Sequence, residues 1–268
     1  MNPLPRLVVL SLLSGLSLLV LLSFGGGRIP QHSAANLAER RVEVVQSKTC
    51  ADGVAGGHFA LTFDDGPHPV NTPAILDWLK ENKLKATFFL LGENAVRYPE
   101  LVARIAAEGH ELGNHTWTHT QLTKLKPEAV RREVKRTHEL IVSLTGRAPV
   151  YFRPPYGSLL PTQRMAIEKE FGYRTVLWDA DSLDWKLKSE EAVVKELHPF
   201  IRKGAIVLAH DIHPRILPAL RKLLPEAAQR GLTPAPLSRV LPMESIVAAK
   251  KAYSRGELAL APIPSKIW

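Results

Sequence analysis

Two adjacent carboxylates, Asp64 and Asp65, follow an apolar, strand-like run over 59–63 and precede Gly66-Pro67. Neighbouring side chains on an extended strand point to opposite faces, but a bend at Gly66-Pro67 lets both carboxylates reach one pocket. In such a pocket one carboxylate can bind a metal ion while the other moves a proton. An isolated Asp-Asp-Gly is more often an ordinary turn after a core strand, so the interpretation depends on the residues that follow.

Two imidazoles, His115 and His119, come four residues apart at the end of another apolar run, 111–115. Imidazole is the commonest ligand of divalent transition metals. Two histidines and one carboxylate make a three-ligand site that leaves a position open for water, and such a metal activates water and polarises a carbonyl group. A lone pair of histidines at this spacing is a weak signal. Its combination with the carboxylate pair favours a metal site.

Three further polar clusters also follow apolar runs: residues 153–157 (Arg-Pro-Pro-Tyr-Gly), 181–185 (Asp-Ser-Leu-Asp-Trp) and 208–210 (Leu-Ala-His). The two prolines fix the backbone and remove donors, so little competes for the amide of Tyr156. Taken singly, Arg153 is typical of an incidental surface charge and His210 of a structural histidine. The carboxyl ends of strands are, however, where barrels and open α/β sheets place their active sites.

Strand-like and helix-like segments alternate from residue 58 onward. The expected strands are 59–63, 86–91, 111–115, 150–153, 175–178 and 205–209. The expected helices are 72–82, 99–108, 127–144, 161–171, 189–201 and 214–229. Thr72 is a plausible N-cap, with Pro73 in the first turn. This alternation predicts six parallel β/α units, or seven, in a barrel or a doubly wound sheet.

Composition bounds the class of protein. The 268 residues are 45% hydrophobic and 23% charged, which is ordinary for a folded domain, and the length suits one large domain or two small ones. The single cysteine, Cys50, excludes an intrachain disulfide and stands in no reactive motif. The formal net charge of +9 favours polyanionic surroundings, but the positive residues are scattered. The chain shows no nucleic-acid motif, so we expect no nucleic-acid partner.

The N-terminal segment 1–27 is expected to be a signal peptide or a signal anchor. Residues 7–24 form an uninterrupted apolar run with Arg6 as the only charged side chain before it. The run is long for a signal peptide and short for a membrane span, and we favour an uncleaved anchor. The remainder is then exported: a linker over 28–57, a catalytic domain over 58–242 and a helix and tail over 243–268.

Together the five clusters resemble the polysaccharide deacetylase family, the NodB-homology domain of carbohydrate esterase family 4. The resemblance covers roughly residues 59–231 and rests on five segments in order: 62–67 (Thr-Phe-Asp-Asp-Gly-Pro), 115–119 (His-Thr-Trp-Thr-His), 153–156, 181–185 and 208–210. It implies an α/β fold, a distorted (β/α) barrel of about seven strands. The family usually adds a last strand, but here 232–237 contains two prolines. That strand is expected to be short or at the sheet edge.

The resemblance also implies the first half of the catalytic set. Asp64 is the catalytic base, and Arg153 orients it. Asp65, His115 and His119 bind a divalent metal, most often Zn²⁺, with Co²⁺ or Mn²⁺ as alternatives. Because each residue is carried over onto a matching position of its segment, none of these roles depends on the last strand.

The remaining roles concern the oxyanion, the leaving group and the pocket wall. The backbone amide of Tyr156 helps to hold the oxyanion. Asp184 supports His210, the general acid, and Asp181 is a second candidate for that supporting role. The acetyl methyl group contacts a lining of two side chains, Trp185 and Leu208.

The sequence therefore predicts a monomeric, metal-dependent N-deacetylase that acts outside the cytoplasm on N-acetylglucosamine-containing glycans and releases acetate. Peptidoglycan, chitin oligosaccharides and related polymers all fit as substrates. Two alternatives stay open: an esterase that removes O-acetyl groups from xylan-like glycans, and a non-catalytic glycan-binding protein on the same fold. An uncleaved N-terminal segment would attach the protein to the membrane.

Overall fold

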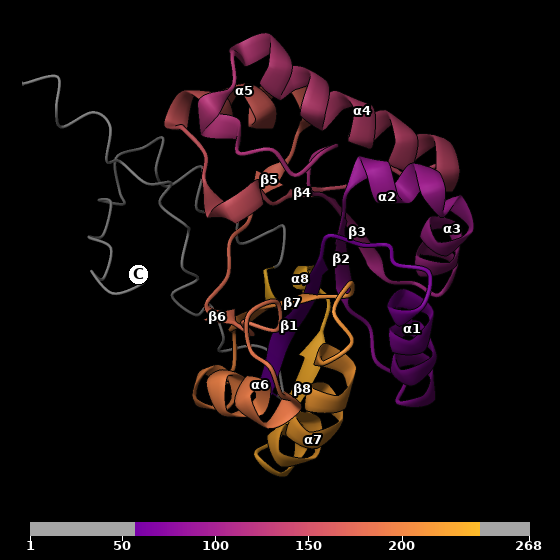
Figure 1. Cartoon of the computed structure of the whole chain (residues 1–268), viewed down its shortest axis with the longest axis vertical. Coiled ribbons are helices and arrows are strands. Elements are labelled where there is room, and N and C mark those ends of the chain that lie inside the picture. The colour runs from indigo at the N-terminus through magenta and orange to yellow at the C-terminus, as the bar shows by residue number, and fades with distance from the viewer. Residues whose placement is uncertain (1–56, 242–268) are drawn as a thin grey trace, which may run out of the picture. The chain divides into compact units, whose positions relative to one another are not determined.

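The computed structural model describes residues 57–241, which form a parallel sheet curled into a half-barrel with helices around it (Figure 1). The strands in chain order are β1 (Gly57–Asp64), β2 (Thr87–Leu90), β3 (Glu111–Asn114), β4 (Tyr151–Phe152), β5 (Arg174–Thr175), β6 (Ala180–Asp181), β7 (Ile206–His210) and β8 (Leu232–Ala235). Their order in the sheet is β5-β4-β3-β2-β1-β7-β6, with β8 beside β1. Every strand pair is parallel, so the predicted β/α architecture is confirmed.

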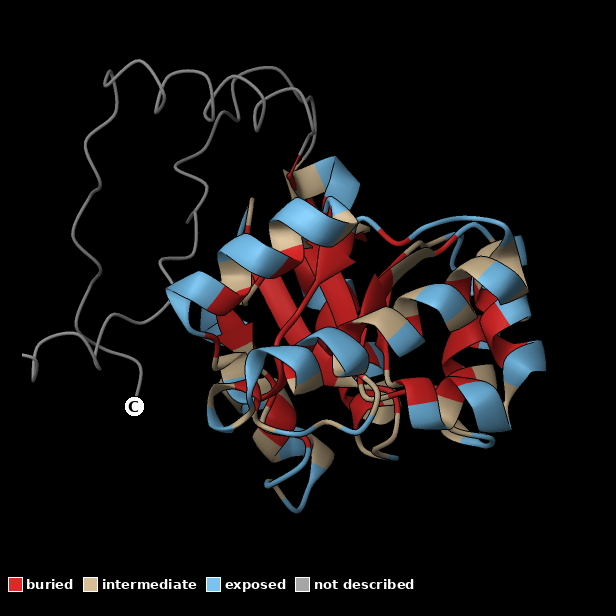
Figure 2. Cartoon of the chain, turned by 90° about the horizontal axis from the view of Figure 1, so that it is seen from above, coloured by how far each residue is buried: buried red, intermediate tan, exposed pale blue. Residues whose placement is uncertain are grey.

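The helices follow the strands in alternation. They are α1 (Asn71–Glu81), α2 (Gly92–Arg97), α3 (Pro99–Ala107), α4 (Pro127–Thr145), α5 (Pro161–Phe171), α6 (Glu190–Leu197), α7 (Ile216–Gln229) and α8 (Leu237–Val240). Each long helix turns a buried face to the sheet and an exposed face outward (Figure 2). The six expected helices are present with small shifts of their ends. The expected helix over 189–201 ends at Leu197 and passes into a 3₁₀ turn at Pro199.

Alternation along β1 divides the interior into two layers. Phe59, Leu61 and Phe63 pack under the helices in the main apolar cluster. Ala60 belongs to a second apolar cluster, on the inner face of the curled sheet, which also contains Ile206 and is closed by α8. Strand side chains alternate between faces, so Thr62 and Asp64 also point inward, above this apolar floor. The half-barrel is therefore apolar at one end and polar at the carboxyl ends of its strands.

The prediction of a single strand over 175–178 is wrong. β5 ends at Thr175 beside β4, and β6 begins at Ala180 beside β7. Between them the chain crosses from one edge of the curled sheet to the other. The Val176 amide still donates to the Phe152 carbonyl, whereas the Asp179 amide donates to the Ile206 carbonyl. An apolar run cannot reveal that its two ends pair with different strands. The sheet consequently has eight strands in the described region, where about seven were expected.

The last strand is short, as expected from its prolines. β8 pairs only with the first half of β1, from Gly57 opposite Leu232 to Ala60 opposite Ala235. The N-cap expected at Thr72 is wrong, because Val70 occupies that position and Thr72 lies in the first turn of α1. The Thr72 hydroxyl instead accepts the His68 amide. The short helix α2 was not expected from the sequence.

The predicted signal or anchor, Cys50, the linker before β1 and the tail over 243–268 lie outside the described residues. Between residues 57 and 241, no helix is both long and apolar enough to cross a membrane.

Candidate active site

The polar segments that follow the strands meet at one end of the half-barrel. Asp64 is the last residue of β1, His210 is the last of β7 and Asp181 is the last of β6. His115 and Arg153 follow directly after β3 and β4. Parallel strands place their carboxyl ends at the same edge, so residues up to 146 positions apart in the chain come within reach of one another.

The two carboxylates reach the same site because the backbone turns at Asp65. Asp64 points inward from β1, and Asp65 has a φ of 73°, in the left-handed region. The Asp65 carbonyl accepts a hydrogen bond of 2.7 Å from the Asn94 side chain in α2, which holds this turn. Gly66 follows, and a β-carbon there would collide with the Asp211 carboxylate. His115 Nε2 lies 3.6 Å from Asp64 Oδ2 and 3.5 Å from Asp65 Oδ1.

Asp65, His115 and His119 form a cluster that fits a divalent metal ion. Their candidate ligand atoms all lie within 4.8 Å of one another, and His119 Nε2 is 3.5 Å from Asp65 Oδ1. His115 Nδ1 lies 2.6 Å from the Arg153 carbonyl oxygen and donates to it, so Nε2 presents its lone pair to the cluster. Asp65 Oδ1 is buried and has no hydrogen-bond partner among the described residues. A buried carboxylate oxygen without a partner is costly unless a cation compensates it.

The ionisation of this cluster agrees with a cation site. Burial raises the pKa of the Asp65 carboxyl, although the charges of His115 and His210 oppose this rise. Burial lowers the pKa of both His115 and His119, which favours neutral imidazoles. Neutral imidazole nitrogens and a carboxylate oxygen suit Zn²⁺, Co²⁺ and Mn²⁺.

Arg153 holds the Asp64 carboxylate by a hydrogen-bonded ion pair. Its Nη1 donates to Asp64 Oδ1 at 2.7 Å and to the Thr62 hydroxyl at 2.8 Å. Its Nη2 donates to the Leu177 carbonyl at 3.1 Å, in the segment between β5 and β6. The guanidinium is fully buried over the Phe89 ring, and burial lowers the Arg153 pKa while the Asp64 charge raises it. Arg153 thus connects the segment between β5 and β6 to β1, and it orients the Asp64 carboxylate.

Asp184 contacts His210 at two points. Asp184 Oδ1 lies 2.6 Å from His210 Nδ1, and Oδ2 accepts the His210 amide at 2.9 Å. Burial lowers the pKa of His210, but the hydrogen bond and charge of Asp184, with the charges of Asp64 and Asp65, raise it to about 9. At neutral pH the imidazole is therefore protonated, and Asp184 engages Nδ1, which leaves Nε2 for another contact.

Asp181, the other candidate support for His210, takes a different position. Its Oδ1 accepts the Leu183 amide at 2.9 Å, and burial raises its pKa. Leu183 has a φ of 49°, so the Asp181 carboxylate caps a tight turn that leads to Asp184. Asp184 is the carboxylate that contacts His210.

The residues predicted for the oxyanion amide (Tyr156) and for the pocket wall (Trp185 and Leu208) differ in exposure. Tyr156 follows β4 with a φ of 59°, and its ring lies 4.6 Å from the His119 ring. Tyr156 is 66% exposed and Trp185 is 56% exposed. Leu208 is buried opposite Thr62 in the register of β7 with β1, and alternation puts it on the same face as His210.

Three polar residues near the site were not predicted to act there: Asn114, Glu133 and Asp211. Asp211 follows His210, is fully buried, and has a pKa that burial raises to about 7. Its Oδ2 accepts the Thr72 hydroxyl at 2.5 Å, which ties the end of β7 to α1. Adjacency to His210 was the available signal for Asp211. Glu133 comes from the middle of α4, where its sequence neighbours give no signal.

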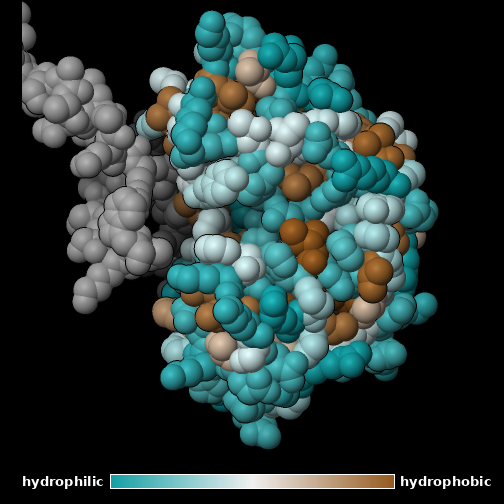
Figure 3. All heavy atoms as spheres, viewed as in Figure 1, coloured by the Kyte–Doolittle hydropathy of each residue, from teal (hydrophilic) through white to brown (hydrophobic). Residues whose placement is uncertain are grey.

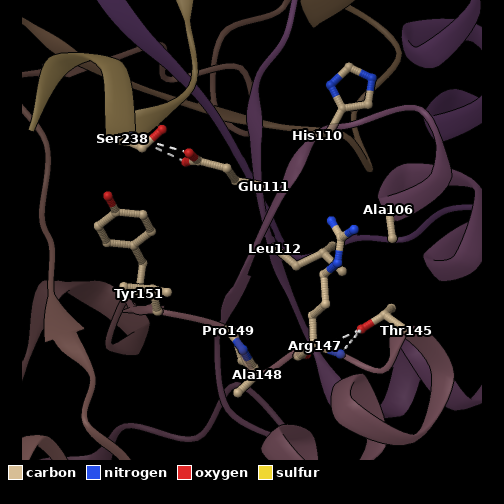
Figure 4. Close-up of a pocket in the computed structure, with 11 residues that line it drawn as sticks. Ala106, His110, Glu111, Leu112, Thr145, Arg147, Ala148, Pro149, Tyr151 and Ser238 are labelled. Carbon is tan, nitrogen blue, oxygen red and sulfur yellow. Dashed lines mark hydrogen bonds between the residues drawn. The ribbon is translucent and has the colours of Figure 1, made fainter. Parts of the chain in front are cut away.

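A separate pocket lies at the opposite end of the half-barrel, where Glu111 begins β3 (Figure 4). The Glu111 carboxylate accepts the Ser238 amide at 3.3 Å and the Thr87 hydroxyl at 2.9 Å. Tyr151 and Arg147 also line it, and none of the predicted site residues does. The molecular face in Figure 3 is largely hydrophilic, with hydrophobic residues in small separate groups.

At the carboxyl edge of this parallel β/α half-barrel, a candidate metal cluster lies beside two ion pairs, Asp64 with Arg153 and Asp184 with His210, an arrangement that suits a hydrolase. The model of the family described as polysaccharide deacetylase matches residues 52–176. A chitooligosaccharide deacetylase of Bradyrhizobium is 38% identical over 183 residues, which cover 68% of this chain and 82% of the relative. The chain belongs to the polysaccharide deacetylase family.

Other relatives extend the comparison. A peptidoglycan-N-acetylglucosamine deacetylase of Bacillus cereus is 42% identical over 177 residues, which cover 64% of each chain. The matched region spans only 36% of longer relatives from Listeria monocytogenes. The structure of the peptidoglycan deacetylase PdaC of Bacillus subtilis is 32% identical, with a TM-score of 0.65, over 75% of this chain and 96% of that one. A pseudoenzyme of carbohydrate esterase family 4 from Bacillus anthracis also has a TM-score of 0.65, at 27% identity over 69% of this chain and 66% of that one.

Proposed function

We propose that the protein removes N-acetyl groups from N-acetylglucosamine-containing glycans, such as peptidoglycan or chitin oligosaccharides, and releases acetate. The observation that carries this proposal is the pairing around the metal cluster: Arg153 holds Asp64 at 2.7 Å, and Asp184 holds His210 at 2.6 Å. The names of the B. cereus and Bradyrhizobium relatives support the substrate class.

Asp65, His115 and His119 would hold the metal, with Zn²⁺ the first choice and Co²⁺ or Mn²⁺ as alternatives. A divalent ion bound there supplies Lewis-acid polarisation of the acetyl carbonyl and makes water a better nucleophile near neutral pH. The orphaned Asp65 Oδ1 and the neutral imidazoles are the features that support this assignment.

The remaining residues move protons and hold charge. Asp64, kept in position by Arg153, accepts a proton from the attacking water as the oxygen–carbon bond forms. The Tyr156 amide donates to the resulting oxyanion, while Trp185 and Leu208 contact the acetyl methyl group. His210 then donates its Nε2 proton to the nitrogen as the carbon–nitrogen bond breaks. The products are acetate and a glucosamine unit, which adds positive charge to the glycan.

The raised pKa of His210 favours an amide substrate over an ester. An amine is a poor leaving group until it is protonated, whereas a sugar alcohol leaves an ester more readily. A charged imidazole beside the scissile bond therefore has more to contribute to N-deacetylation than to the removal of O-acetyl groups. The non-catalytic alternative is less favoured, because the base, the three metal ligands and the acid are all present.

Acetate release from a panel of glycans tests this function. The purified exported region, loaded with Zn²⁺, is expected to release acetate from N-acetylated peptidoglycan fragments or chitin oligosaccharides faster than from acetylated xylan. Comparison with the Asp64→Asn variant separates catalysis at this site from a contaminating activity. Faster release from xylan would favour the esterase, and glycan binding without any acetate would favour the non-catalytic alternative.

The metal assignment predicts that the wild type binds one divalent ion per chain and that His119→Ala loses most of it. The change removes one of the three proposed ligands and is expected to leave the fold intact, because His119 lies in a loop and its side chain is 27% exposed. Elemental analysis after dialysis measures the content. The control is His198→Ala, an exposed histidine at the end of α6. Equal metal content in wild type and His119→Ala would contradict the ligand assignment.

We also propose an extracytoplasmic location, with residues 7–24 retained as an anchor or removed on export. The apolar run and the cell-wall substrates in the names of relatives support this. Fractionation of cells that express the whole chain is expected to find the protein in the membrane or outside the cytoplasm. N-terminal sequencing then shows whether residues 7–24 are retained. Full-length protein in the soluble cytoplasm would refute the proposal.

A further inference from the structure

The two candidate histidine ligands belong to a turn that its own residues do not favour. Thr116 has a φ of 75° and His119 a φ of 60°, both in the left-handed region. A β-branched residue such as Thr116 is rarely found there, and such backbone conformations persist only where the surroundings impose them. The distance between His115 and His119 therefore depends on groups outside the turn.

Glu133, in the middle of α4, supplies one such group. Its Oε2 accepts the backbone amide of Trp117 at 3.1 Å and that of Thr118 at 2.8 Å. The same oxygen lies 3.1 Å from the Thr118 hydroxyl, which also donates to it. Hydrogen bonds to an ionised acceptor are roughly twice as strong as neutral ones. One carboxylate oxygen thus engages both residues at the centre of the turn.

The opposite side of the turn is held by the first amides of α2. Gly92 donates to the Thr116 carbonyl at 3.0 Å, and Glu93 donates to the Trp117 carbonyl at 3.1 Å. The helices α2 and α4 pack side by side (Figure 1). The turn therefore has its carbonyls bound to one helix and its amides bound to the other.

The Trp117 ring fixes the same turn by packing. The guanidinium of Arg136, one turn of α4 beyond Glu133, lies 3.8 Å from the ring centroid. A β-carbon at Gly92 would collide with the same ring, so only glycine fits there. The remaining amides have local acceptors: Thr116 donates to the Asn114 side chain at 2.8 Å, and His119 donates to the Thr116 hydroxyl at 3.2 Å.

We propose that Glu133 is a positioning residue of the metal site. Its carboxylate holds the amides of Trp117 and Thr118 and thereby sets His115 and His119 at the spacing that a divalent ion needs. Glu133 touches neither the ion nor the substrate. This inference rests on the metal assignment made above, and it adds a residue that lies 14 positions beyond His119 in the chain.

The test measures Zn²⁺ affinity of the purified protein by competition with a chromogenic chelator, together with the melting temperature of the metal-free form. Glu133→Ala is expected to weaken Zn²⁺ binding about 10–100-fold, the usual range for groups that orient metal ligands. Glu133→Gln is expected to recover most of the affinity, because its amide oxygen can still accept both amides. Glu133→Asp, one methylene shorter, is expected to weaken binding and provides a milder variant if Glu133→Ala does not fold.

Glu139→Ala is the matched control. Glu139 lies on the same helix, is exposed and pairs with Lys135 at 3.3 Å. Its replacement by alanine removes one negative charge from α4, as Glu133→Ala does, but removes no hydrogen bond to the turn between the histidines. Its Zn²⁺ affinity should equal that of the wild type. If the Glu133 variants melt at lower temperature but bind Zn²⁺ as tightly as the wild type, Glu133 is only structural and the inference is wrong. A wild type that binds none of Zn²⁺, Co²⁺ and Mn²⁺ would refute the metal assignment and this inference with it.

Discussion

Asp64→Asn is expected to lower the rate of deacetylation about 10²–10⁴-fold, the usual contribution of a general base, while the protein keeps its metal ion. An amide oxygen can still accept the hydrogen bond from Arg153, but it does not take a proton from water. The metal is retained because Asp65, and not Asp64, supplies the carboxylate ligand in the proposed site. Steady-state rates of acetate release and elemental analysis of the same preparation measure the two effects.

A loss of charge at Asp64 also leaves Arg153 buried beside a neutral partner, so the melting temperature must be measured in parallel. Asp77→Asn serves as the control, since Asp77 pairs with Arg104 at the surface of α1. Its rate should be unchanged. A near-normal rate for a folded Asp64→Asn would show that Asp64 is a structural residue of the turn.

His210→Ala is expected to slow acetamide hydrolysis about 10²–10⁴-fold and to slow an activated acetyl ester much less. The amine must be protonated as it leaves, whereas a nitrophenolate leaves without a proton. Rates on an N-acetylated chitin oligosaccharide and on 4-nitrophenyl acetate provide the comparison. His213→Ala is the control. His213 lies in the loop after β7, its ring is 5.7 Å from that of His210, and it has no role in the proposed mechanism. Equal losses on both substrates would place the proton donor elsewhere.

The pH profile tests the same residue through Asp184. A general acid works only while protonated, so activity falls as the pH rises through the pKa of His210, which lies at about 9. Asp184→Asn removes the charge that raises this pKa, so the alkaline limb should move to lower pH. The limb belongs to the coupled site as a whole, and its direction is the informative quantity. An unmoved limb would contradict the assignment of His210.

The sequence by itself located the residues that converge. Short apolar runs that alternate with helix-like segments placed Asp64, His115, Arg153 and His210 at or directly after strand ends, and all the strands are parallel. Parallel strands bring their carboxyl ends to one edge whatever the details of packing, so a local pattern was enough to predict a shared site. The end of α4 is likewise set locally, because Gly146, with a φ of 67°, follows its last residue.

The tertiary structure decided which groups in that site touch. The resemblance implied Asp184 as the support of His210 and left Asp181 as a second candidate. The turn at Leu183 directs Asp184 to His210 and leaves Asp181 as a cap. The run after Thr175 crosses the open edge of the sheet, because its two ends pair with different strands and Arg153 binds the carbonyls between them.

Glu133 shows the same limit of local information. It reaches the turn between the two histidines only because α4 packs beside α2. The sequences of the two helices gave no signal that predicted this contact. Short-range patterns determine where chemical groups lie along the elements. The pairing of groups across the site depends on backbone turns and helix contacts between distant residues, and these exist only in the folded chain.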